Sequence, residues 1–189
     1  MPHLALYNFN NFRVPSDEPA NQGFHERNDR NFAAAEVSEG FVARSGHPDE
    51  PGPPSWGEQV YPRFFRDNGD GWAPSTLSRD LPSLFVYSYA GIHADALRNA
   101  RQWFDRQAWP PYVLWWVEEG HVPAWREGVE RLEHLHDQGP SPHAFDFKRP
   151  FDAAGNSTSI YHDAVRRCRE ANERAQTPLV DRALRSSGA

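Results

Sequence analysis

The stretch WAPSTLSRDLPSLFVYSYAGIHADALRNARQWF (72–104), followed by PPYVLWWVEEGHVP (110–123) and WREGVERLEHLHDQGPSPHAFDFKRPF (125–151), decides the fold of this chain. Its first residues, Trp72–Ser78, predict a strand. A helix follows, because Asp80 can cap free backbone amides and a proline stands in the first turn, where its missing N–H costs nothing. Gly91 is expected to bend this helical stretch, whose second piece carries His93 on an apolar stripe.

The segment Tyr112–Val117 predicts a central strand, because it is a continuous apolar run. Successive side chains of a strand point to opposite faces, so both faces of this strand are apolar. If helices cover one face, the other needs a second sheet, a barrel interior or a partner subunit. An amphipathic helix over Trp125–His136 and a short strand over Ala144–Phe147 are expected to follow.

The N-terminal part of the chain predicts a strand, a helix and a second strand. Leu4–Phe12 reads as the first strand and Phe41–Ser45 as the second, with Gly40 as the C-cap candidate of the helix between them. One face of that helix is spaced at the helical period and consists of Phe24, Asn28, Asn31, Phe32 and Ala35.

Two segments extend this core. Residues 46–71 are rich in proline, glycine and charge and predict a long inserted loop, which the aromatic side chains of residues 56–65 favour docking onto the domain. Residues 152–189 form a polar tail with a predicted helix from Ile160 to about Gln176. We therefore expect one domain over residues 1–151 and a partly helical tail.

Composition limits the classes of function. The chain has 189 residues, a hydrophobic fraction of 38% and a formal net charge of −6 at pH 7. These values predict one core and argue against a broad basic surface for nucleic acids. No stretch approaches the roughly 20 apolar residues that span a bilayer, and the N-terminus lacks the pattern of a secretion signal. We expect a soluble, cytoplasmic protein with no nucleic-acid or membrane partner. Cys168 is the one cysteine, which excludes an internal disulfide.

The order strand, helix, strand, loop, strand, helix, strand predicts an α+β chain with the split βαβ pattern of ferredoxin-like folds, an antiparallel sheet, and an extra C-terminal helix and strand. Five segments together resemble the DUF3291 family: LALYNF (4–9), SEGFVARSG (38–46), TLSRDLPSLFVYSYAGIHADALRNARQWF (76–104), PPYVLWWVEEGHVP (110–123) and ERLEHLHDQGPSPHAFDFKRPF (130–151). This domain of unknown function is usually placed in the dimeric α/β-barrel superfamily. The resemblance covers roughly residues 4–151, and the long loop and the tail depart from it.

The resemblance implies a homodimer in which two four-stranded sheets pack face to face. The second face of Tyr112–Val117 would then meet the partner's sheet, and a pocket would lie between the sheet and the helices of each protomer. The superfamily holds monooxygenases that need no cofactor, haem-degrading oxygenases, haem-dependent dehydratases, decarboxylases and isomerases, so the fold does not name a reaction.

His93 is the first candidate for chemistry. An imidazole on a stripe of alanines that also carries Trp103 is partly withdrawn from water, and it can act as a general base, a hydrogen-bond donor or an axial haem ligand. The structural alternative is a core histidine that a backbone carbonyl satisfies. Tyr87 and Tyr89 precede His93 in the same helical stretch, where their phenols could orient a substrate or donate a proton, or simply pack in the core.

His121 follows the central strand, at an exit where side chains often line the mouth of a site, although a surface position fits equally well. Trp115 and Trp116 alternate to opposite faces, so one is expected to line the pocket and the other the dimer interface. Asn8 and Trp103 are further candidates for substrate binding. His134 and His136 project about 200 degrees apart on a helix and predict no metal site.

No GxSxG, HExxH, Walker or GxGxxG motif is present. Our leading hypothesis is a small-molecule enzyme, most simply an oxygenase or related oxidoreductase, that acts on an aromatic or polyketide-like substrate in an aromatic-lined pocket. It would use either no cofactor or haem, with His93 as base or as iron ligand. A lyase, dehydratase or isomerase that uses the same histidine is one alternative, and a non-catalytic ligand-binding dimer is the other.

Overall fold

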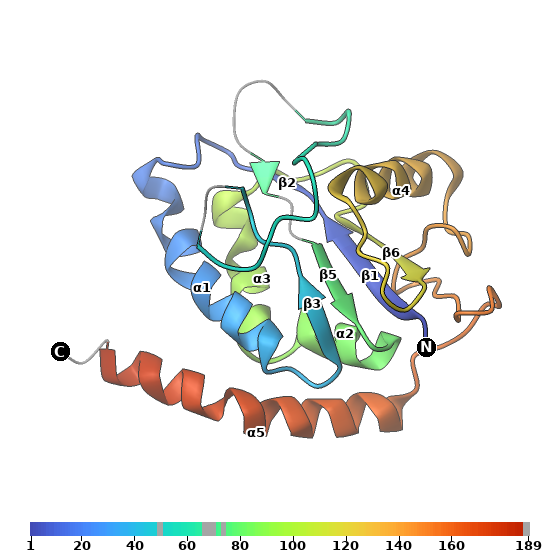
Figure 1. The fold of residues 1–189 in the computed structure, drawn as a ribbon. Helices are drawn as coiled ribbons and strands as arrows, with labels where there is room; N and C mark the ends of the chain where they lie inside the picture. Colours follow the sequence, from blue (N-terminus) through green and yellow to red (C-terminus); the bar gives the residue numbers. More distant parts are fainter. Residues whose placement is uncertain (49–50, 66–70, 73–74, 187–189) are drawn as a thin grey trace.

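The computed structural model describes residues 1–48, 51–65, 71–72 and 75–186, and it shows an open antiparallel sheet with helices on both faces (Figure 1). The strands of this sheet are β1 (His3–Asn8), β3 (Phe41–Arg44), β5 (Ser75–Ser78) and β6 (Tyr112–Val117), in the order β3-β5-β1-β6. All neighbouring pairs are antiparallel, and β5 lies between β1 and β3. This is the strand order of a split βαβ unit, which confirms the predicted mixed chain with an antiparallel sheet.

Two of the predicted strands are broken. Leu4–Phe12 is divided at Phe9 into β1 and the short β2 (Asn10–Asn11). β2 is not part of the main sheet and pairs with β4 (Gly71–Trp72) in a separate two-stranded sheet. Of the predicted strand, only β1 belongs to the main sheet. β5 forms the second half of the predicted strand at residues 72–78, and residues 73–74 of that prediction lie outside the described part of the chain.

The prediction of a strand over Ala144–Phe147 is wrong. A single bridge joins Phe145 to Leu114 of β6, with both backbone hydrogen bonds at 2.8 and 2.9 Å. The chain then turns away, because the Asp146 side chain accepts hydrogen bonds from the backbone amides of Lys148 and Arg149. This local turn competes with the ladder and limits the pairing to one residue.

The helices lie close to the predicted positions. Asp80 caps α2 (Leu81–Tyr89) as expected, and its Oδ1 accepts a hydrogen bond from the Ser83 amide at 2.9 Å. Gly91, with a φ of +57°, separates α2 from α3 (Gly91–Trp103). The other helices are α1 (Gln22–Glu36), α4 (Trp125–Gln138), α5 (His162–Ser186) and a short 3₁₀ turn (Pro19–Asn21). Within the described residues, no helix has the length and apolar character needed to cross a membrane.

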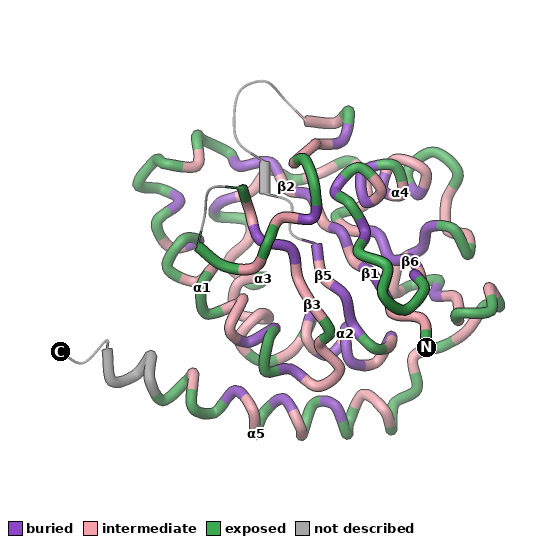
Figure 2. Tube along the Cα trace, in the orientation of Figure 1, coloured by how far each residue is buried: buried purple, intermediate pink, exposed green. Residues whose placement is uncertain are grey.

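The two faces of the sheet carry separate apolar cores, and Figure 2 shows buried residues both in the strands and in the helices that pack on them. On one face, Leu4 and Leu114 pack with Leu84 of α2. On the other face, Trp115 packs with Trp125 of α4. Helix α4 thus covers the second face of β6. For this face, the apolar run of β6 predicted a second sheet, a barrel interior or a partner subunit. The apolar character of both faces is explained within one chain, and the homodimer stays a prediction.

Residues 51–65 of the inserted loop fold back onto the α4 side of the sheet, as the aromatic residues of this loop predicted. The rings of Tyr61 and Phe65 stack with centroids 4.8 Å apart, and both contact Phe9. Phe64 stacks on Trp109, 5.1 Å between centroids. Residues 49–50 and 66–70 of the predicted loop lie outside the described residues.

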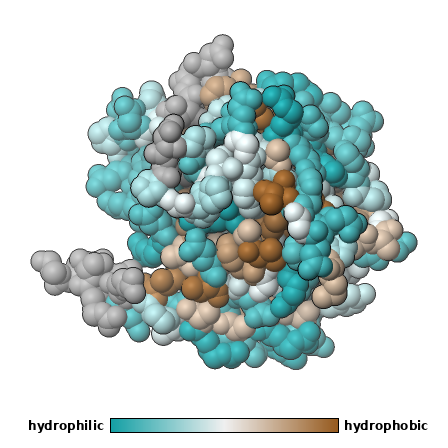
Figure 3. All heavy atoms as spheres, in the orientation of Figure 1, coloured by the Kyte–Doolittle hydropathy of each residue, from teal (hydrophilic) through white to brown (hydrophobic). Residues whose placement is uncertain are grey.

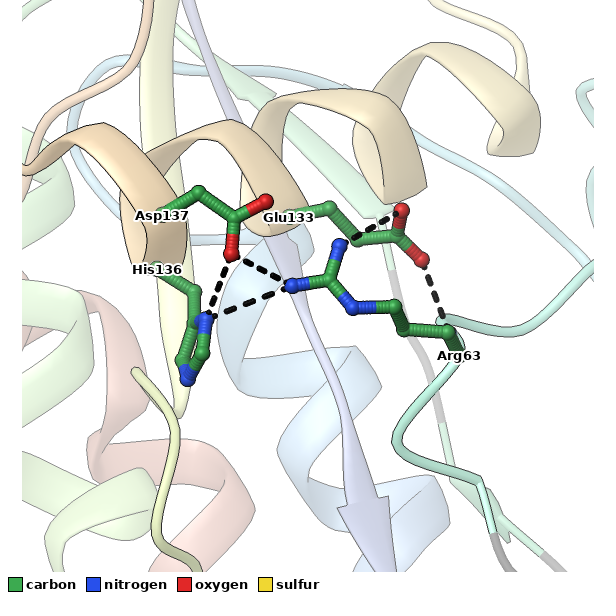
Figure 4. Close-up of polar contacts among 4 residues, drawn as sticks. All are labelled: Arg63, Glu133, His136 and Asp137. Atoms are coloured by element: carbon green, nitrogen blue, oxygen red, sulfur yellow. Dashed lines mark hydrogen bonds and ion pairs between the residues drawn. The ribbon is translucent and has the colours of Figure 1, made fainter.

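Arg63 ties this loop to α4 (Figure 4). Its backbone amide donates to Glu133 Oε1 at 2.8 Å, and its guanidinium donates to Asp137 Oδ1 at 2.5 Å. The same guanidinium approaches His136 Nδ1 at 3.4 Å, and the Asp137 pKa is lowered chiefly by its hydrogen bond from Arg63. These groups face solvent, so the contacts set the position of the loop more than they stabilise the fold.

Helix α5 docks on α2 and α3 and then extends past the body of the protein (Figure 1). It is longer than the predicted helix, which ends at about Gln176: the chain continues as a helix through Pro178 to Ser186. Two buried amides hold it. Asn172 Oδ1 accepts from the Glu39 amide at 2.7 Å, and Gln176 contacts two elements at once. Figure 3 shows apolar atoms along the line where α5 meets the body.

Gln176 joins the end of α1 to the beginning of α3. Its Oε1 accepts from the Ile92 amide at 3.2 Å, and its Nε2 donates to Ser38 Oγ at 3.2 Å. A Cβ atom at Gly91 would lie 2.3 Å from Gln176 Oε1. Two features therefore require glycine at this position: the positive φ and the close approach of the Gln176 side chain. The side chain therefore satisfies one of the free amides at the start of α3, directly before His93.

Replacing Gln176 by alanine is expected to lower the free energy of unfolding by about 1–3 kcal/mol, because the partly buried Ile92 amide loses its acceptor and the buried Ser38 hydroxyl loses its donor. Chemical denaturation followed by circular dichroism measures the loss. Glu170→Ala, on an exposed position of the same helix, is the matched control and should change stability little. Equal stability of both variants and the parent chain would show that the contacts of Gln176 do not hold α5.

Candidate functional site

A cavity of about 300 Å³ lies between the sheet and the layer of α1, α2 and α3, where the family resemblance implies a pocket. We call it the helix-side cavity. Leu6, Asn8 and Thr76 line it from the sheet, and Tyr112 and Phe147 line it near the first residue of β6. Its volume is at the lower end of the range typical of small-molecule sites. The aromatic part of the helical wall consists of Phe24, Phe32, Tyr87, Tyr89, Trp103 and Phe104.

His93 lines this cavity from the first turn of α3. The break at Gly91 brings its Nδ1 within 2.9 Å of the Ser88 carbonyl oxygen. A carbonyl can only accept, so Nδ1 carries the proton and Nε2 keeps its lone pair in the neutral ring. Burial lowers the pKa of His93, although the hydrogen bond to Ser88 acts in the opposite direction. His93 is therefore a neutral imidazole at pH 7 whose Nε2 can accept a proton.

Three phenols line the cavity together with this histidine. The rings of Tyr87 and His93 are 4.9 Å apart between centroids, and the Tyr87 hydroxyl makes a long contact of 3.5 Å with the Asn31 carbonyl. The Tyr89 hydroxyl donates to the Tyr112 hydroxyl at 3.3 Å. Burial raises the pKa of Tyr87, and burial followed by the bond to Tyr89 raises that of Tyr112. Both therefore stay protonated and can donate a hydrogen bond to a ligand. Tyr89, 45% exposed, lies toward solvent.

Asparagines add a polar strip to the cavity. Asn8 comes from β1, and Asn28 and Asn31 come from α1. Asn31 Oδ1 is buried, and no hydrogen-bond partner for it exists among the described residues. Asn28 and Asn31, which the sequence pattern placed on one face of the helix together with apolar residues, thus line the cavity. The signal was present in the sequence, because asparagine is rare on a helix face that packs only against a core.

The charge of the cavity is set by Arg44. Its guanidinium lies 4.0 Å from the centroid of the Phe32 ring, and its Nε donates to Glu36 Oε1 at 2.8 Å. Within the described residues, the lining contains no carboxylate. The site therefore suits a neutral molecule or one with partial negative charge, and it offers nothing to balance a cation.

The structure brings five of the predicted site residues together. Asn8, Tyr87, Tyr89, His93 and Trp103 all line the helix-side cavity. Trp103 is buried and also packs edge-to-face on Phe24, with ring centroids 5.9 Å apart.

The other three predicted residues do not line this cavity. Trp115 is buried on the α4 side, where its Nε1 donates to Glu127 Oε1 at 2.8 Å. His121 is exposed and lies 2.8 Å from the second oxygen of the same carboxylate. Trp116 donates to the Phe151 carbonyl at 2.8 Å. Strand alternation separates the two faces of β6, and the cavity opens near Tyr112, at the other end of this strand.

Haem is a poor fit to the lining residues. His93 Nε2 is available as an axial ligand, but haem carries two propionates and the one cationic side chain described in the lining, Arg44, already pairs with Glu36. Within the described residues, no group of three His, Cys, Asp or Glu side chains is placed to hold a metal ion. The side chains present favour chemistry by the imidazole and the phenols.

Comparison with protein families matches residues 3–162 to the family described as "Domain of unknown function (DUF3291)". The match contains the sheet, α1 to α4 and the whole lining of the helix-side cavity, and it ends where α5 begins. Searches of the curated proteins and of the solved structures found no match to this chain.

Proposed function

The chain belongs to the DUF3291 family, and from that premise we propose that it is an enzyme that removes a proton from a small aromatic or polyketide-like molecule held in the helix-side cavity. The observation that carries the proposal is the state of His93. Its Nδ1 is committed to the Ser88 carbonyl, burial keeps the ring neutral, and Nε2 belongs to a residue that lines the cavity. A neutral, oriented imidazole is a general base at neutral pH.

The surroundings of His93 support a substrate that becomes an anion. Tyr87 and Tyr112 stay protonated, so their hydroxyls can stabilise an oxygen that gains negative charge. No carboxylate lines the described cavity to oppose that charge. The anion of an electron-rich phenol can pass an electron directly to dioxygen, and we therefore propose an oxygenase that needs no cofactor as the reaction class.

Two measurements test the proposal with defined probes. Proton abstraction is followed by deuterium incorporation into 2-tetralone in heavy water, and oxygenation by oxygen uptake with 1-naphthol. Exchange above the uncatalysed rate together with oxygen uptake is the expected result. Exchange without uptake would replace the oxygenase by an isomerase or lyase that uses the same base. If both probes bind and neither reaction occurs, the enzymatic proposal is overturned in favour of a binding protein.

A further inference from the structure

The break between α2 and α3 separates two backbone groups that a continuous helix would pair with each other. In an α-helix each amide donates to the carbonyl four residues earlier, so the Ile92 amide would donate to the Ser88 carbonyl. Gly91, with a φ of +57°, interrupts the helix between them. The Ser88 carbonyl instead accepts from His93 Nδ1 at 2.9 Å, and the Ile92 amide instead donates to Gln176 Oε1 at 3.2 Å. Two side chains thus take the place of one backbone hydrogen bond.

Helix α3 has no N-cap side chain of its own. The residue at its N-cap position is Ala90, whose methyl group cannot accept a hydrogen bond. An N-cap side chain ordinarily accepts from the second or third amide of the helix. Ile92 is the second residue of α3, so Gln176 supplies from α5 the acceptor that Ala90 lacks. The beginning of α3, where His93 lies, therefore depends on a residue 84 positions further along the chain.

The Gln176 side chain is held in one orientation. It is buried, and its Nε2 donates to Ser38 Oγ at 3.2 Å. The Ser38 hydroxyl donates its own proton to the Ala34 carbonyl at 2.6 Å, so toward Gln176 it can only accept. The nitrogen of the Gln176 amide is therefore fixed on the side of Ser38, and its oxygen is left for the Ile92 amide.

We propose that Gln176 is the positioning residue of His93: by binding the Ile92 amide, it reserves the Ser88 carbonyl for His93 Nδ1. The inference rests on the proposed function for the role of His93 as a base, and it adds the residue that sets the tautomer of this base. With the proton held on Nδ1, Nε2 keeps the lone pair that proton abstraction needs.

The loss of Gln176 has a definite consequence for His93. The Ile92 amide, left without an acceptor, then competes with His93 Nδ1 for the Ser88 carbonyl. The imidazole loses the contact that fixes its proton and its orientation. The family match ends at residue 162, where α5 begins, so this control comes from the helix that follows the family domain.

Nuclear magnetic resonance of isotope-labelled histidine side chains shows which nitrogen of the neutral ring carries the proton. The chain has nine histidines, and the signals of His93 are those missing from His93→Gln. We expect the proton on Nδ1 in the parent chain and a mixture of both tautomers in Gln176→Leu, which fills the space without offering an acceptor. The exchange rate with 2-tetralone should fall by up to about 10²-fold, the effect of a misplaced reacting group. The affinity for 1-naphthol should be kept, because Gln176 lies outside the lining of the cavity.

Ser38→Ala is the matched control. It removes the partner of Gln176 Nε2 and leaves Oε1 with the Ile92 amide, so it should lower stability and keep the His93 proton on Nδ1. Circular dichroism checks that the variants fold, and Gln176→Ala replaces the leucine variant if that one is unfolded. The inference is overturned if the parent chain does not hold the proton on Nδ1, or if the folded Gln176 variant still does. A shift of equal size in Ser38→Ala would also overturn it, because the effect would then come from a general loosening of α5.

Failure of this inference and failure of the proposed function give different results. The tautomer is measured without turnover, so a proton on Nδ1 that depends on Gln176 stands even if neither proton exchange nor oxygen uptake occurs. Conversely, exchange and oxygen uptake with an unchanged tautomer in Gln176→Leu would support the function and refute Gln176 as the positioning residue.

Discussion

Replacing His93 by glutamine is expected to lower the rate of deuterium exchange into 2-tetralone by roughly 10²–10⁴-fold, the range that a positioned general base contributes. Glutamine can still donate a hydrogen bond to the Ser88 carbonyl, so the break between α2 and α3 should persist. The amide has no lone pair basic enough to take a proton at neutral pH. The variant should therefore fold and bind naphthols while it loses the chemical step.

His121→Gln is the matched control for this experiment. It removes an imidazole that is exposed and bound to Glu127 on the α4 side of the sheet. We expect the exchange rate of this variant to equal that of the parent chain. A large loss in His121→Gln and none in His93→Gln would move the base to the other face and refute the site.

The pH dependence of both rate and stability follows from the lowered pKa of His93. Because the folded protein keeps this ring neutral, the rate should remain high as pH falls below 6.5, the ordinary value for histidine, and decline only below the lowered pKa. Between these two values the unfolded chain binds a proton that the folded chain does not, so stability rises with pH and is lost on acidification. This part of the acid destabilisation should be absent in His93→Gln, which denaturation at several pH values measures.

The core of the candidate site could be predicted because it lies in one continuous stretch of sequence. Asp80 and Gly91 mark the beginning and the break of the helical pair, and they place Tyr87 and His93 on opposite sides of that break. A resemblance that covers the same stretch then puts the pocket on the helical side of the sheet. Asn8 belongs to β1, and successive side chains of a strand point to opposite faces, so its face is fixed once the register is known.

Other parts of the site depend on packing that the pattern does not contain. Asn28 and Asn31 match the helical period of α1 as well as an apolar residue would, so the periodicity alone does not separate a core position from a cavity position. Tyr112 and Trp116 share a face of β6, yet of these two only Tyr112 lines the cavity, because the cavity lies at the Tyr112 end of the strand; the Trp116 indole N–H donates to the Phe151 carbonyl instead. Tertiary packing decides which face of β6 lies on the side of α2 and which face α4 covers.

Replacing Trp125 by alanine is expected to lower the free energy of unfolding by about 3–5 kcal/mol, the range for truncating a large aromatic side chain in a core. Trp125 has no exposed surface, and its ring meets that of Tyr7 edge-to-face with centroids 6.2 Å apart. Its Nε1 donates to Ser45 Oγ at 3.0 Å, which also accepts from the backbone amide of Trp56 at 3.1 Å. The substitution removes both the packing and the hydrogen bond to Ser45, the residue that also binds the inserted loop at Trp56.

The position beside Trp125 explains why this loss cannot be repaired by a shift of the helix. A Cβ atom at Gly128 would lie 2.7 Å from ring carbons of Tyr7, so α4 already sits as close to β1 as its backbone permits. The space left by the indole should therefore remain as a cavity.

Urea denaturation of Trp125→Ala at two protein concentrations tests whether α4 alone covers this face. Because the described contacts of Trp125 lie within one chain, we expect a loss of stability that does not depend on protein concentration, whereas a face completed by a partner subunit would make it concentration-dependent. Arg126→Ala, at the adjacent exposed position, is the matched control and should stay close to the parent chain. A loss in Trp125→Ala as small as that of the control would contradict the role of α4 as the cover of the sheet.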